Sequence, residues 1–89
     1  MVSPNYDKYY NTITQFDKNA WVESNCAEIA FLNIGTSNFS VLGFVVNPGF
    51  GISFDGQENQ LDVTKYQIIF DNTGVNNAAV FRKMYTEVI

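Results

Sequence analysis

Apolar and polar residues alternate in short runs along most of the chain, and turn residues separate the runs. Residues 27–35, AEIAFLNIG, alternate Ile29 and Phe31 with Glu28 and Ala30. A period of two is typical of a β-strand with one buried face, because successive side chains of a strand point to opposite sides. The run therefore predicts a strand whose Ile29 and Phe31 face a core.

The next apolar run, residues 39–46 (FSVLGFVV), has large apolar side chains at both odd and even positions. Residues 35–38, GTSN, precede it and have the composition of a tight turn, so the two runs are predicted to form a hairpin. A strand that is apolar on both faces of a thin sandwich usually has a neighbour outside its own core. We therefore expect at least one of Leu42, Phe44 and Val46 to pack against another subunit or a different protein partner.

Asn-Pro-Gly at residues 47–49 ends this run, because proline cannot donate a hydrogen bond to a strand ladder and Pro-Gly favours a type II turn. Further alternating runs follow in residues 50–54 and 61–71, separated by a polar loop. One face of the second of these runs holds three large apolar side chains, Tyr66, Ile68 and Phe70.

The closing run, residues 78–89, fits a strand or a helix by its period, and its β-branched and aromatic residues favour a strand. No stretch of the chain shows a convincing helical face. The sequence therefore predicts an all-β fold, a small antiparallel β-sandwich or barrel of five to seven short strands. Residues 26–89 are assigned to this β-sandwich domain, and residues 1–25 to an N-terminal arm or an edge strand.

Residues 1–25 have no clean period of either kind and mix aromatic side chains with Asn, Thr, Asp and Lys. Such a segment is too aromatic for ordinary disorder and too polar for a core of its own. It suits an arm that packs on another molecule or forms a first edge strand, and the alternative is a strand pair folded on the chain's own sandwich. In the first case the anchors are its large aromatic residues, Tyr6, Tyr9, Tyr10, Phe16 and Trp21.

The composition favours association with other proteins. Hydrophobic residues make up 46% of the 89 residues and charged residues only 16%, so part of the apolar surface is expected to belong to an interface. The net charge of -4 argues against a nucleic-acid partner, because affinity for phosphate backbones comes from clustered Lys and Arg. The chain begins without a secretion signal and has no run long enough to span a membrane, which predicts a cytoplasmic start and no membrane partner.

The absence of histidine excludes the usual serine or cysteine triads and any histidine metal site. Cys26 is the only cysteine and is predicted to be a small buried filler. Asp55, Glu58 and Asp62, with Asn59, supply oxygen ligands for calcium in principle, but their spacing matches no EF-hand and favours a solvated loop. No catalytic residue, no metal site and no cofactor is predicted, and the chain is not expected to be an enzyme.

A set of motifs between residues 33 and 85 resembles a known group of proteins. These are NIGTSNFSVLGFVVNPG, then an acidic loop, DVTKYQIIF and VFRKMY. The pattern is similar to that of small structural proteins in the virions of tailed, crAss-like bacteriophages. The resemblance implies a non-enzymatic β-sandwich that decorates or extends a capsid, often as a symmetric oligomer. It also implies framework roles at turns and strands for Asn33, Gly35, Thr36, Pro48, Gly49, Asp62, Thr64, Tyr66, Arg82, Lys83 and Tyr85.

The expected function is that of a capsid auxiliary, decoration or head-fibre component, assembled in the host cytoplasm and located in the virion. Its expected partners are the capsid protein and further copies of itself, as a homotrimer. The alternative is a small carbohydrate- or receptor-binding module in which Tyr9, Tyr10 and Trp21 form an aromatic platform for sugar. A small bacterial domain with another role is a third possibility. The residues predicted to make the interface are Tyr6, Tyr9, Tyr10, Phe16, Trp21, Leu42, Phe44 and Val46.

Overall fold

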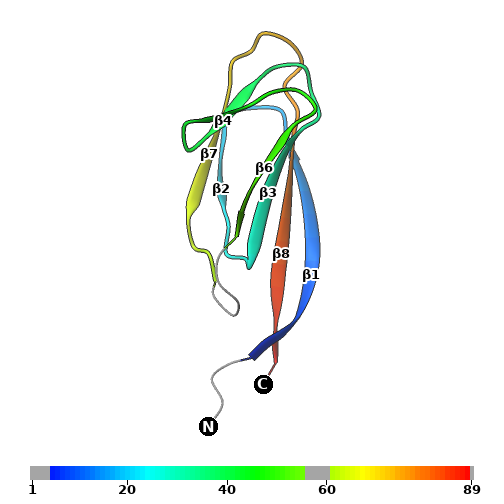
Figure 1. Cartoon of the computed structure of the whole chain (residues 1–89), viewed down its shortest axis with the longest axis vertical. Coiled ribbons are helices and arrows are strands. Elements are labelled where there is room, and N and C mark those ends of the chain that lie inside the picture. Colours follow the sequence, from blue (N-terminus) through cyan, green and yellow to red (C-terminus); the bar gives the residue numbers. More distant parts are fainter. Residues whose placement is uncertain (1–4, 56–60, 89) are drawn as a thin grey trace.

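A computed structural model describes residues 5–55 and 61–88 of the chain (Figure 1). This part contains eight β-strands and no helix, so the predicted all-β class is confirmed. The strands are β1 (Asn5–Phe16), β2 (Ala20–Glu23), β3 (Glu28–Asn33), β4 (Phe39–Val41), β5 (Phe44–Val46), β6 (Gly51–Asp55), β7 (Lys65–Phe70) and β8 (Ala78–Val88).

The strands form two four-stranded sheets that pack face to face. The first has the order β1-β8-β3-β6 and the second the order β2-β7-β4-β5, and all their pairings are antiparallel. The predicted antiparallel β-sandwich is confirmed, with more strands than the five to seven expected. Every connection except that between β4 and β5 passes from one sheet to the other.

The core lies between the sheets and is made of the alternating positions that face inward. In β3 the burial alternates so that Ile29 and Phe31 are fully buried, as predicted. Tyr66, Ile68 and Phe70 of β7 face them from the second sheet. Phe31 packs against Tyr66 in a tilted arrangement with ring centroids 5.4 Å apart, so aromatic contacts join the two sheets in the core.

The predicted continuous strand over residues 39–46 is wrong. The chain turns back at Leu42 and Gly43, and Val41 pairs with Phe44 across a two-residue hairpin loop. Both loop residues have positive φ, 51° and 82°, as a type I′ turn requires. Glycine adopts this conformation without strain, but leucine does not. The residue types at positions 42 and 43 therefore did not predict a turn.

The predicted hairpin at residues 35–38 is also wrong, because β3 and β4 lie in different sheets. Residues 35–38 cross from the first sheet to the second. They are held on the loop after β7, where the Thr36 and Ser37 amides donate to the Val75 carbonyl oxygen at 2.8 and 3.0 Å. The turn residues at this position therefore serve a crossover between layers.

The Pro-Gly turn after β5 agrees with the prediction. Gly49 has a φ of 83°, and the Phe50 amide donates to the Asn47 carbonyl oxygen at 3.0 Å, as in a type II turn. This turn also leads from the second sheet back to the first, where β6 pairs with β3.

The N-terminal segment provides one outer strand to each sheet, which corresponds to the edge-strand alternative for residues 5–16 and 20–23. β1 pairs with β8 from Asn5↔Val88 to Phe16↔Ala78, and β2 pairs with β7. β3 accompanies β8 only as far as Lys83, so β1 is the sole paired neighbour of the last part of β8. The two strands continue past the others as a ribbon (Figure 1) and contribute to a long shape of 53 × 20 × 18 Å.

Candidate functional site

The outer face of the second sheet carries several exposed apolar side chains. Strand alternation places the side chains between the buried positions of β2, β7 and β4 on this side. We call it the Trp21 face and define it by the outward residues of the sheet and its hairpin turn, Trp21, Ser40, Leu42, Val45, Gln67 and Ile69. Trp21 is 65% exposed, Leu42 54%, Val45 66% and Ile69 44%.

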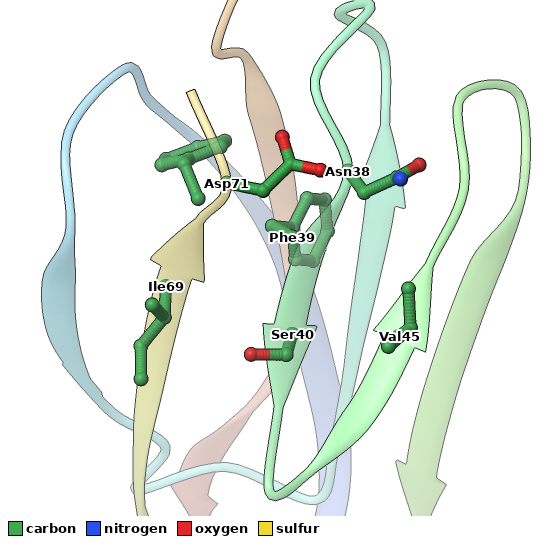
Figure 2. A pocket seen from close by; sticks show the side chains of 7 residues that line it. Asn38, Phe39, Ser40, Val45, Ile69 and Asp71 are labelled. Carbon is green, nitrogen blue, oxygen red and sulfur yellow. The ribbon is translucent and has the colours of Figure 1, made fainter. Parts of the chain in front are cut away.

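Two shallow hollows lie on this face because a small residue stands between larger ones. One, of about 310 Å³, has Ser40 at its floor with Ile69 and Val45 on either side (Figure 2). The other, of about 180 Å³, is lined by Trp21, Leu42 and Gln67 among others. A flat face with hollows between exposed apolar side chains can accept the side chains of another protein.

Three charged side chains, Glu23, Lys65 and Asp71, lie at or near this face. Glu23 and Lys65 lie opposite each other in β2 and β7, and their side chains approach to 3.8 Å. Both are largely exposed, so this ion pair adds little stability. At the other end, hydrogen bonds from Thr73 hold the pKa of the Asp71 carboxyl below its usual value. Asp71 lines the larger hollow and stays ionised, so it adds a negative charge to this end of the face.

The structure brings together two of the predicted interface residues, Trp21 and Leu42, at one hollow. Phe44 is exposed at the end of the hairpin, whereas Val46 is buried in the core. Val46 pairs with Phe39 on the inward side, because the hairpin reverses the faces expected for a continuous strand.

The remaining predicted interface residues lie in β1, in the other sheet. Phe16 is half-buried and packs on the core, and Tyr10 is exposed. The side chains of Tyr6 and Tyr9 lie outside the described part of the structure. Tyr10 and Trp21 stand on different sheets, so the predicted sugar platform is not assembled from these two residues.

Sequence analysis missed Val45 and Ile69 as surface residues. Ile69 carried a signal, because it follows Ile68 directly and breaks the alternation of β7 with an apolar residue at an outward position. Val45 gave no such signal, because the side of the sheet to which it points depends on the turn at Leu42 and Gly43, which was not predicted.

A polar cluster closes the opposite end of the core around Asp62. Its carboxylate accepts hydrogen bonds from the Tyr66 hydroxyl at 2.6 Å and the Thr64 amide at 2.8 Å. Burial raises the pKa of the Asp62 carboxyl, but these bonds outweigh it and hold that pKa below its usual value. Burial, with the bond to Asp62, raises the pKa of Tyr66 to about 12.

Cys26 lies next to the same cluster, which explains why its thiol is unreactive. Its backbone forms a bridge with Asp62, and its side chain is fully buried. Burial and the nearby Asp62 carboxylate raise the pKa of the Cys26 thiol, which disfavours the reactive thiolate. The predicted buried filler is confirmed.

We expect the shifted pKa values of Asp62 and Tyr66 to make the stability of the protein depend on pH. The lowered pKa of Asp62 means that its contribution is complete above pH 3.8 and is lost as the pH falls through the folded pKa. The raised pKa of Tyr66 means that its contribution is complete below pH 10 and is lost as the pH rises towards 12. Tyr66→Phe should lower the free energy of unfolding at neutral pH by about 1.5–3 kcal/mol.

Urea unfolding of both proteins over this pH range provides the measurement. The difference between them should shrink at both extremes, since either protonation of Asp62 or ionisation of Tyr66 weakens the bond in the wild type. A difference that stays constant with pH would show that the hydroxyl bond to Asp62 is not the cause.

No group of three or more acidic or cysteine residues among the described residues is arranged to hold a metal ion. Asp62 is engaged in the polar cluster, and Glu58 and Asn59 of the loop that was considered for calcium lie outside the described residues. In residues 5–55 and 61–88, no helix is long and apolar enough to cross a membrane.

The Trp21 face and the β1–β8 ribbon thus both have features of protein contact. In comparisons with known proteins, no protein-family model, no curated protein and no solved structure matches the chain.

Proposed function

We propose that the chain is a non-enzymatic structural protein of a tailed bacteriophage virion, a capsid auxiliary or head-fibre component that binds the capsid and associates with itself. The observation that supports this most is the ribbon formed by the ends of β1 and β8. It projects from the sandwich, as an attachment element does, and leaves the sandwich as the displayed body (Figure 1).

The physical argument concerns the stability of the ribbon. Beyond Lys83, β8 is paired only with β1, and an isolated two-stranded ribbon is at best marginally stable in water. The ribbon also contains Tyr6, Tyr9 and Tyr10, and the exposed Tyr10 shows that aromatic surface there is left uncovered by the sandwich. Docking on a capsid would cover both the exposed Tyr10 ring and the open edge of β1.

Attachment can be tested by co-sedimentation with capsids of the phage that encodes the chain. The triple variant Tyr6→Ser, Tyr9→Ser, Tyr10→Ser should bind at least about 10-fold more weakly than the wild type, because buried aromatic residues dominate interfaces. Phe50→Ser is the matched control, since Phe50 is an exposed aromatic residue in the turn before β6, outside the ribbon.

A triple variant that binds as well as the wild type would contradict the role of the ribbon. A wild-type protein that binds no capsid would contradict the virion function itself. In that case a saturable affinity for a surface glycan that is lost in Trp21→Ser would favour the alternative, a carbohydrate-binding module.

A further inference from the structure

β6 forms an open edge of the first sheet and directs half of its backbone groups away from that sheet. The sheet order ends at β6, which is paired with β3. The Asn33 amide donates to the Phe50 carbonyl oxygen at 2.9 Å, and hydrogen-bonded pairs recur at every second residue of an antiparallel ladder. Ile52 and Phe54 therefore bond to β3. The amides and carbonyls at the positions between them point to the open edge, and these positions are Gly51, Ser53 and Asp55.

The inward side chains of β6 are only partly covered by the chain's own core. Ile52 and Phe54 pack against the core but remain half-buried, whereas Phe31 and Ile29, opposite them in β3, are fully buried. Phe54 also reaches Tyr66 of the second sheet, with ring centroids 5.1 Å apart. A strand added beside β6 would cover the rest of Ile52 and Phe54.

The edge is accessible from the side of the sandwich. In Figure 2, β6 is the green strand that follows the Pro-Gly turn, and it lies beyond β5 of the second sheet. Proteins commonly protect an edge with proline, inward charges or bulges. β6 has no proline and no inward charge, and its one charged residue is Asp55 at its end. The edge is therefore suited to the addition of a strand.

We propose that β6 pairs antiparallel with β6 of a second copy about a two-fold axis at Ser53, so that the two four-stranded first sheets become one continuous sheet. This inference rests on the proposed function, since it names the surface used in self-association and leaves the ribbon to the capsid. Ser53 is then opposite its own counterpart, and Gly51 is opposite Asp55 of the other copy. These are the positions whose amides and carbonyls point outward, so the pairing gives them partners.

The side chains of β6 fit this symmetry. On the inward side, Ile52 of each copy meets Phe54 of the other, which extends the apolar rows of the core across the axis. On the outward side, Ser53 is small and meets only itself. Asp55 is opposite Gly51 of the other copy, so the ladder opposes no like charges.

The other edge strands of the described residues fit a second copy less well. β5 has three residues and turns only Val45 towards its edge, because the two-residue hairpin loop makes Val41 and Phe44 a hydrogen-bonded pair. In β2, the inward Val22 is 3% exposed and has little surface left to bury. β1 belongs to the ribbon. β6 therefore combines outward backbone groups with partly exposed inward side chains.

The experiment asks whether residue 53 lies opposite itself. Ser53→Glu and Ser53→Lys each place two like charges on the axis, where the two Cα atoms of a hydrogen-bonded pair are about 5.5 Å apart. Each variant alone should raise the dissociation constant in sedimentation equilibrium at least about 3-fold at low ionic strength. An equimolar mixture of the two should dimerise more tightly than either alone, because opposite charges then meet.

Ser53→Pro tests the backbone pairing. It removes an amide that points away from β3 and should raise the dissociation constant at least about 10-fold. Ser53→Ala is the matched control, since it keeps the amide and should dimerise like the wild type. In the wild type, hydrogen exchange at the Ser53 amide should slow as the dimer forms.

A wild-type protein that stays monomeric up to about 1 mM would overturn the two-fold pair. A trimer, or a dimer that is unaffected by Ser53→Pro, would also overturn it. A monomer that binds capsids would overturn only this inference, whereas a dimer that binds none would overturn only the virion function.

Discussion

Asn33→Leu is expected to cost about 3–5 kcal/mol of stability, because it removes three hydrogen bonds to backbone groups, two of them buried and one partly buried. Asn33 is 1% exposed at the end of β3. Its Nδ2 donates to the carbonyl oxygens of Ser37 at 2.7 Å and Val46 at 2.9 Å, and its Oδ1 accepts from the Gly35 amide at 3.0 Å. Leucine has a similar size but can satisfy none of them.

The position of Asn33 explains why the effect should be large. Its side chain connects two segments that pass between the sheets. One is the crossover after β3, and the other is the end of β5, after which the chain returns to the first sheet. Urea unfolding should show a lower midpoint with an unchanged m value. Asn11→Leu is the control, because it makes the same chemical change at an exposed position of β1 and should alter stability by no more than about 0.5 kcal/mol. Equal effects of the two variants would contradict the role assigned to Asn33.

Gly35→Ala is expected to destabilise the protein by roughly 2–4 kcal/mol through a clash of backbone with backbone. An added Cβ would overlap the Val75 carbonyl oxygen and lie 2.7 Å from the Asn77 nitrogen. Backbone atoms cannot rotate away as a side chain does. The crossover would have to separate from the loop, which breaks the bonds from the Thr36 and Ser37 amides to Val75.

Gly49→Ala separates this clash from the general cost of replacing glycine. Gly49 has a positive φ, but an added Cβ there would have no atom within 4 Å. Its cost should therefore be confined to backbone strain, on the order of 1 kcal/mol. Thermal or urea unfolding of the two variants in parallel should rank Gly35→Ala clearly below Gly49→Ala, and the reverse order would contradict the close approach at Gly35.

Strands with one buried face were predictable, because burial of one face imposes its period directly on the sequence. The alternation placed Ile29 with Phe31, and Tyr66 with Ile68, on one face of their strands, and both faces are buried in the core. The Pro-Gly turn was also predictable, since its residues are those that its dihedral angles require.

The pairing partner of each strand was harder to predict from the sequence. Residues 35–38 have hairpin composition, yet Gly35 is needed there for close approach to Val75 in a crossover. Composition reports that the chain turns, whereas the partner of the next strand depends on contacts with residues distant in sequence. The same limit applied to the site, where Trp21 and Leu42 were both predicted as interface residues but only the pairing of β2 and β4 with β7 placed them at one hollow.

The sequence by itself determined the class of fold, the core positions of the regular strands and the absence of histidine chemistry, because each follows from local pattern or composition. The tertiary structure alone decided that residues 39–46 bend into a hairpin at Leu42 and that the chain changes sheets at nearly every connection. The physical reason is that a leucine in the left-handed region opposes its own local preference. The pairing of β4 with β5 in the assembled sheet holds this conformation. No local sequence pattern therefore predicts it.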